Sequence, residues 1–103
     1  MAPFNNSNGN RNISIIGMGY VGLPTALAFH DAGYNVTGVD VSKQVIEILS
    51  RGEVHLVDDH SDLKIPVESD SWKVTCSFSE SVRYADIVII TVPTPVKGDK
   101  TPD

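Results

Sequence analysis

Three glycines and one aspartate have the types and the spacing that nucleotide binding requires. Gly17, Gly19 and Gly22 directly follow an apolar segment, and Asp40 follows Gly22 by 18 residues. Glycines at this spacing let a strand turn tightly into a helix and let the backbone approach a pyrophosphate. A carboxylate about 20 residues further on bonds a ribose hydroxyl. The pattern predicts a dinucleotide site in which unpaired N–H groups at the helix start face the phosphates.

The residues around the glycines predict the elements that would position them. Residues 13–16 predict a strand, and apolar residues at helical spacing predict a helix over about 20–32. Gly33 is a typical helix stop, and residues 34–39 predict a second strand that ends just before Asp40. The alternative, a tight turn that binds no ligand, is disfavoured by the complete pattern of strand, turn, helix, strand and aspartate.

The rest of the chain continues the alternation of strands and helices. Ser42 is expected to cap a second helix that ends at Gly52. Residues 53–71 are polar and acidic, and they predict an irregular loop with at most one helical turn. The remaining predicted elements are a strand at 72–76, a short serine-capped helix at 79–85 and a strand at 87–92.

This order of elements predicts an α/β fold. We expect a Rossmann-like, partial doubly wound parallel sheet of about four strands in the order 3-2-1-4, with two main helices and one short helix. Residues 1–12 are expected to form a disordered lead-in. Residues 13–103 are expected to be the N-terminal part of a longer domain, because no further element covers the apolar strand at 87–92. That strand should offer a free edge through which the chain self-associates.

Composition excludes several classes of protein. The chain has 103 residues, enough for one domain, and its 41% hydrophobic content is ordinary for a globular protein. A net charge of −5, with only 8 Lys and Arg, argues against nucleic-acid binding. We expect no membrane span, because no apolar run approaches about 20 residues, and no secretory signal. Cys76 is the single cysteine; we expect a buried, inert thiol and a cytoplasmic protein.

Several blocks of sequence carry a resemblance to a known family. They are Gly-Met-Gly-Tyr-Val-Gly-Leu-Pro at 17–24, Gly-Val-Asp at 38–40, Arg-Gly-Glu-Val-His-Leu-Val at 51–57, and Val-Pro-Thr-Pro at 92–95 with Lys-Gly-Asp at 97–99 and Pro-Asp at 102–103. Together they resemble the UDP-glucose/GDP-mannose dehydrogenase family, the nucleotide-sugar 6-dehydrogenases, and look most like its UDP-N-acetylmannosamine branch. The resemblance implies an enzyme that oxidises the C6 alcohol of a UDP-sugar to the uronic acid with two NAD. This chain would be its NAD-binding segment.

The resemblance also implies which residues bind the cofactor. Gly17, Gly19 and Gly22 would form the pyrophosphate turn. Tyr20 and Val21 would lend their backbone amides at the helix start.

Three further residues are carried over by position. Asp40 would bond the adenosine ribose and repel the 2′-phosphate of NADP, so NAD is the expected cofactor. Pro93 and Thr94 would line the cofactor, with Thr94 an auxiliary candidate near the reacting centre. An alternative is that these two residues only terminate the strand.

The family's catalytic cysteine, with its lysine and asparagine partners, lies far downstream of the matching segment. We therefore expect no catalytic residue here, an inactive segment on its own, and an intact enzyme that is homo-oligomeric and binds a UDP-sugar. The chain also departs from the family at two places. Val96 replaces a second hydroxyl residue, and Asp58-Asp59-His60 stands where many members have Glu-Pro.

Other interpretations remain open from the residues alone. A divalent metal could be held by acids and histidines of the loop, but their spacing matches no strong zinc signature, so no metal is predicted. Those residues are His55, Asp58, Asp59, His60 and Asp62. The two alternative functions are a stand-alone nucleotide-binding or regulatory module and a hydroxy-acid type of NAD dehydrogenase.

Overall fold

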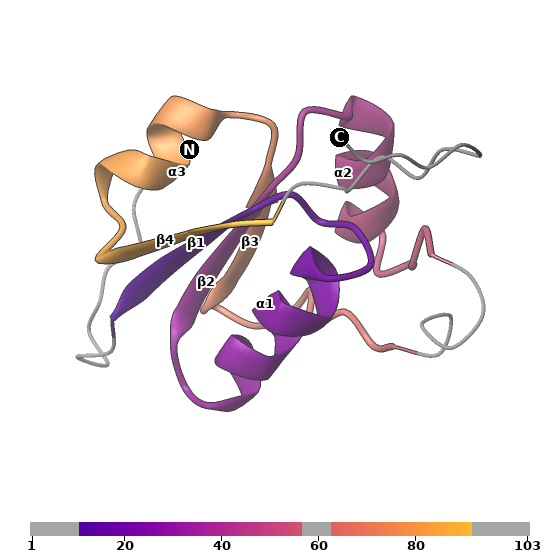
Figure 1. Cartoon of the computed structure of the whole chain (residues 1–103). Coiled ribbons are helices and arrows are strands. Elements are labelled where there is room, and N and C mark those ends of the chain that lie inside the picture. The colour runs from indigo at the N-terminus through magenta and orange to yellow at the C-terminus, as the bar shows by residue number, and fades with distance from the viewer. Residues whose placement is uncertain (1–10, 57–62, 92–103) are drawn as a thin grey trace, which may run out of the picture.

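A four-stranded parallel sheet forms the centre of the molecule (Figure 1). The structure is a computed structural model, and it describes residues 11–56 and 63–91. The sheet order is β3-β2-β1-β4, which confirms the predicted order. The strands are β1 (Asn12–Ile16), β2 (Asn35–Val39), β3 (Trp72–Thr75) and β4 (Ile87–Ile90).

In the described part of the chain, three helices connect the strands in the order that the sequence predicts. They are α1 (Gly22–Asp31), α2 (Lys43–Ser50) and α3 (Phe78–Arg83). The predicted cap of α2 is confirmed, because the Ser42 side chain accepts a hydrogen bond from the Val45 N–H at 3.2 Å. The predicted start of α3 is wrong by one residue. Ser77 rather than Ser79 caps this helix, and its hydroxyl accepts from the Glu80 N–H at 3.3 Å.

The helices divide between the two faces of the sheet. Figure 1 shows α1 and α2 on one side and α3 on the other. Alternate residues of β1 meet these two layers: Ile15 packs in the cluster beneath α1, whereas the Ser14 hydroxyl donates to the Ser81 carbonyl of α3 at 2.7 Å. A strand with helices on both faces needs apolar residues on both, and the buried Ser14 is tolerated because its hydroxyl is paired.

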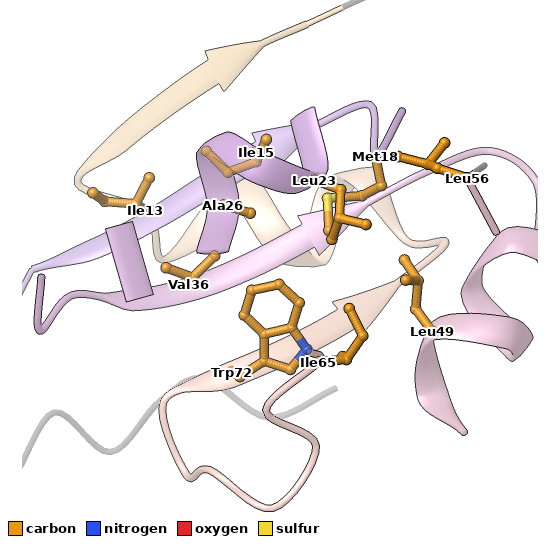
Figure 2. Packing of buried hydrophobic residues seen from close by; sticks show 10 residues of the cluster. All are labelled: Ile13, Ile15, Met18, Leu23, Ala26, Val36, Leu49, Leu56, Ile65 and Trp72. Atoms are coloured by element: carbon orange, nitrogen blue, oxygen red, sulfur yellow. The ribbon is translucent and has the colours of Figure 1, made fainter. Parts of the chain in front are cut away.

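The main core lies between the sheet and the α1–α2 layer, and Figure 2 shows how its side chains interlock. Its members come from strands, helices, the turn between β1 and α1, and the loop that follows α2. They are Ile13, Ile15, Met18, Leu23, Ala26, Val36, Leu49, Leu56, Ile65 and Trp72. The loop over 53–71 was expected to be irregular, and its described parts, 53–56 and 63–71, contain no helix. Leu56 and Ile65 nevertheless anchor both described parts in the core.

Two predictions from the sequence are wrong: the start of the first strand and the burial of Cys76. Asn12 belongs to β1 rather than to a disordered lead-in, because its N–H bonds the Asp86 carboxylate at 2.8 Å and its register pairs it with Asn35. Cys76 is exposed, not buried, because β3 ends at Thr75 and the chain bends away from the sheet there. The remaining lead-in, residues 1–10, lies outside the described residues.

β4 is an edge strand, as the sequence predicted. Among residues 11–56 and 63–91 it pairs only with β1, and three of its four apolar side chains are exposed: Ile87, Val88 and Ile90. Such an edge presents apolar surface and unpaired backbone groups together. No helix within residues 11–56 and 63–91 has the length and apolar character needed to cross a bilayer.

Candidate functional site

The glycine turn begins at the carboxyl end of β1, between the ends of β2 and β4. In the register of the sheet, Ile16 lies beside Val39 on one side and Ile90 on the other. Gly17 then leaves the sheet with a φ of 100°, a conformation that glycine adopts without steric cost. The Gly17 N–H donates to the Val39 carbonyl at 2.7 Å, so the turn stays attached to β2.

Thr91, the first residue after β4, holds the other side of the turn. Its N–H donates to the Ile16 carbonyl at 2.8 Å, and its Oγ1 donates to the Gly17 carbonyl at 2.8 Å. Thr91 is not among the site residues predicted from the sequence. The available signal was a hydroxyl residue directly after an apolar strand, at the edge of a parallel sheet where ligands bind.

The three glycines of the motif have different surroundings. A Cβ on Gly17 would overlap the Thr91 carbonyl, and a Cβ on Gly22 would overlap the Gly17 carbonyl. Both glycines are therefore required by the packing of the chain itself. Around Gly19, by contrast, a Cβ would meet no atom within 4 Å, and its φ is not positive. Nothing in the described part of the chain requires glycine at position 19.

The start of α1 offers unpaired donors beside Gly19. Among the described residues no side chain caps this helix, and its first turn contains no acidic residue. The Gly19 carbonyl accepts from the Leu23 N–H at 3.0 Å, but within residues 11–56 and 63–91 no acceptor contacts the N–H groups of Gly19, Val21 and Gly22. Because the helix dipole places partial positive charge here, the arrangement suits an anion.

Asp40 directly follows β2, and its carboxylate reaches across to the glycine turn. Oδ2 accepts from the Met18 N–H at 2.9 Å, and Oδ1 accepts from the Ser42 N–H at 3.0 Å. Asp40 therefore braces the turn as well as the start of α2. Each carboxylate oxygen has a second lone pair, so both oxygens can still accept from a ribose hydroxyl.

Met18 is fixed from several directions. Its side chain is fully buried against Gly38, where a Cβ would overlap the Met18 thioether. The Met18 carbonyl accepts a hydrogen bond from Nε2 of His55 at 2.7 Å. The other ring nitrogen, Nδ1, is buried and has no hydrogen-bond partner among the described residues. From the sequence, His55 is part of the family block at 51–57 and a candidate metal ligand, but nothing local indicates a contact 37 residues away.

The structure thus brings together four of the predicted residues, Gly17, Gly19, Gly22 and Asp40, at one edge of the sheet. Tyr20 and Val21 lie there too, with exposed side chains. Pro93 and Thr94 lie outside the described residues, as do the loop residues 57–62 that the metal alternative needs. Within residues 11–56 and 63–91, no three His, Cys, Asp or Glu side chains gather as metal ligands would.

Comparison with known proteins identifies the family. A family model described as the NAD-binding domain of the UDP-glucose/GDP-mannose dehydrogenase family matches residues 11–103. The chain belongs to this family. Its cofactor is accordingly NAD, and membership of this family argues against the alternative of a hydroxy-acid type of dehydrogenase.

Relatives within the UDP-glucose/GDP-mannose dehydrogenase family match the same segment. The chain is 43% identical over 93 residues to UDP-N-acetyl-D-mannosamine dehydrogenase of Salmonella typhimurium, covering 88% of this chain and 21% of that enzyme. It is 37% identical over 89 residues to the enzyme of that name from Pyrococcus horikoshii, covering 84% of this chain and 21% of the relative. The chain therefore spans about a fifth of the length of these relatives.

Solved structures of the UDP-glucose/GDP-mannose dehydrogenase family share the fold. A ternary complex of GDP-mannose dehydrogenase from Pseudomonas aeruginosa superimposes with a TM-score of 0.77 at 31% identity, covering 88% of this chain and 21% of that one. UDP-D-ManNAc dehydrogenase from Pyrococcus horikoshii gives a TM-score of 0.75 at 35% identity, covering 89% of this chain and 22% of that one. The Rossmann-like arrangement expected from the sequence is that of these enzymes.

Proposed function

We propose that this chain binds the ADP half of NAD through the turn from Gly17 to Gly22, within a UDP-sugar 6-dehydrogenase. The observation that carries the proposal is the open space beside Gly19, next to the unpaired N–H groups of Val21 and Gly22. A glycine that the fold does not need is explained if a ligand needs the space. A pyrophosphate fits because it is anionic, and because it accepts hydrogen bonds from backbone amides at a helix N-terminus.

Within this proposal the three glycines of the motif have different roles. Gly17 and Gly22 shape the turn, whereas Gly19 lets the phosphates approach the backbone. The amides of Tyr20 and Val21 lie at the start of α1, where the dipole favours negative charge. Pro93 and Thr94 are proposed to line the nicotinamide side of the cofactor, by their position in the family motif.

Asp40 is proposed to select NAD over NADP. Its two oxygens accept from backbone amides and retain lone pairs for ribose hydroxyls, whereas a 2′-phosphate would meet like charge. In a calorimetric titration of Asp40→Ala, we expect NAD affinity to fall about tenfold or more, and NADP affinity to fall much less. Part of the loss will be common to both cofactors, because Met18 and Ser42 lose their acceptor.

A matched control separates cofactor recognition from loss of a structural carboxylate. Asp86→Ala also removes a carboxylate that accepts from a backbone amide, that of Asn12 at 2.8 Å, but at the amino end of β1. This variant should bind NAD and NADP like the unmodified chain. Equal losses of NAD and NADP affinity in the Asp40 variant would overturn the assigned role of Asp40.

The proposed reaction of the enzyme that contains this segment is oxidation of UDP-N-acetylmannosamine at C6. Support comes from the relatives of that name, which are 37% to 43% identical to this chain over the shared segment. Converting a primary alcohol to a carboxylate removes four electrons. Because a hydride carries two electrons, two NAD molecules are needed per sugar, and each accepts one hydride. The family's cysteine nucleophile lies outside the matching segment, so we propose that this segment binds cofactor without catalysing the reaction alone. A homo-oligomeric intact enzyme remains part of the proposal.

A chimaera tests the proposed substrate. Residues 11–103 would replace the matching segment of the Salmonella typhimurium relative, and NADH formation would be measured with UDP-N-acetylmannosamine and, separately, UDP-glucose. We expect two NADH per UDP-N-acetylmannosamine. A chimaera that binds NAD but forms no NADH with either sugar would favour the alternative of a nucleotide-binding module without chemistry.

A further inference from the structure

His55 contacts the glycine turn but belongs neither to the glycine motif nor to the hydrophobic core cluster. It lies in the loop after α2, and it reaches the glycine turn through a single 2.7 Å hydrogen bond from Nε2 to the Met18 carbonyl. A carbonyl can only accept, so Nε2 carries the proton in this contact. In the neutral ring Nδ1 is then a bare acceptor, buried and without a partner among the described residues. Burying an unpaired acceptor lowers stability, so fold stability alone does not account for this histidine.

The bond from His55 acts on the peptide group that presents the Gly19 amide. The Met18 carbonyl and the Gly19 N–H belong to the same peptide unit, which is trans and planar. In such a unit the C=O and the N–H point in opposite directions. Holding the Met18 carbonyl toward His55 therefore turns the Gly19 N–H to the opposite side.

We propose that His55 is a positioning residue for the cofactor pyrophosphate: by holding the Met18 carbonyl, it aims the Gly19 N–H at the phosphates. The inference rests on the proposed function of the turn. Asp40 complements the effect, because it fixes the preceding N–H, that of Met18, at 2.9 Å. Two side chains from different elements thus lock the backbone on both sides of Met18 before the ligand arrives. Such preorganisation lowers the entropic cost of binding.

The test compares His55→Leu, which removes the donor, with His55→Gln, whose amide N–H₂ can restore it. His30→Leu is the matched control. His30 is also partly buried, and its Nε2 makes one short hydrogen bond, with the Ser69 hydroxyl at 2.8 Å, near the far end of α1. All measurements are made on this chain at a temperature at which thermal unfolding shows every variant to be folded.

Affinities for ADP and for adenosine separate an effect on the phosphates from a general one. We expect His55→Leu to weaken ADP about three- to tenfold and to leave adenosine unchanged, because one hydrogen bond to the phosphates loses its alignment. His55→Gln should recover most of the ADP affinity. His30→Leu should bind both ligands normally. The amide resonance of Gly19 should move in ligand-free His55→Leu and remain in place in His30→Leu, because hydrogen bonding at a carbonyl polarises its peptide unit.

The outcomes distinguish this inference from the function on which it rests. If the unmodified chain does not bind ADP, the proposed function fails and the inference fails with it. If the unmodified chain binds ADP and His55→Leu binds it equally well, only the inference is overturned. Parallel losses of ADP and adenosine, or a Gly19 resonance that does not move, would also overturn it.

Discussion

Gly17 and Gly22 lack a side chain because the backbone of the chain occupies the space, whereas Gly19 has open space beside it. One motif thus contains two glycines that serve folding and one that is left for a ligand. Around them, Asp40 and His55 fix the Met18 N–H and carbonyl at 2.9 and 2.7 Å. Ligand recognition at the residue scale therefore depends on backbone groups that side chains hold in place.

Gly22→Ala should destabilise the fold rather than affect binding alone. The added methyl group would overlap the Gly17 carbonyl, which is backbone and cannot rotate away. We expect the free energy of unfolding to fall by about 2 kcal/mol, typical of overpacking. Urea denaturation measures it. An unchanged unfolding midpoint in this variant would contradict the packing role assigned to Gly22.

Thr91→Val keeps the shape of the side chain and removes its hydroxyl. The Gly17 carbonyl then loses the donor at 2.8 Å, while the backbone bond from Thr91 to Ile16 remains. We expect a loss of about 1 kcal/mol in the free energy of unfolding, the net value of one hydrogen bond. Thr91→Ser keeps the hydroxyl donor and is the control. Its free energy of unfolding should fall by less than that of Thr91→Val, because the bond to the Gly17 carbonyl remains.

At the scale of elements, the three helices begin differently. Serine hydroxyls cap α2 and α3, through Ser42 and Ser77, but no side chain caps α1. Among the described helices, the one that faces the proposed ligand is thus the one that lacks a side-chain cap. The sequence allowed the cap of α2 to be predicted, because only one serine precedes that helix. It did not locate the cap of α3, because serines occur at 77, 79 and 81 and the choice depends on where β3 ends.

Ser42→Ala should destabilise α2 by about 1 kcal/mol, because the Val45 N–H loses its acceptor. Thermal unfolding measures the loss. Ser79→Ala is the control: Ser79 is exposed and is not the cap of α3, so its replacement should leave stability unchanged within about 0.5 kcal/mol. Equal destabilisation by the two substitutions would contradict the capping assignment.

At the scale of the whole molecule, hydrophobic periodicity and turn residues were sufficient to predict the strand order, the three helices and the edge position of β4. The glycines and Asp40 were predictable because their spacing is local to one βαβ unit. Thr91 and His55 were not, since their contacts with Gly17 and Met18 span 74 and 37 residues and exist only after the sheet has formed. The exposure of Cys76 was missed because the last residues of a strand cannot be located from alternation alone.

The exposed edge of β4 predicts self-association of this chain at high concentration. Ile90 is 63% exposed, and Val88 beside it is 41% exposed. In sedimentation velocity experiments, we expect the average mass to rise with concentration, and the substitution Ile90→Lys to reduce the rise, because a charge on an edge strand opposes pairing. Val41→Lys is the control, since Val41 is exposed by 95% but lies outside β4. Strictly monomeric behaviour at high concentration would refute the prediction.

The central claim is that position 19 is glycine because a cofactor phosphate approaches the backbone there. Calorimetric titration of NAD into Gly19→Ala, with chemical unfolding of the same sample, tests it most directly. The claim predicts a free energy of unfolding within about 0.5 kcal/mol of that of the unmodified chain, because the methyl group enters open space. NAD affinity should nevertheless fall about tenfold or more. A variant that is equally stable and binds NAD as tightly as the unmodified chain would contradict the claim.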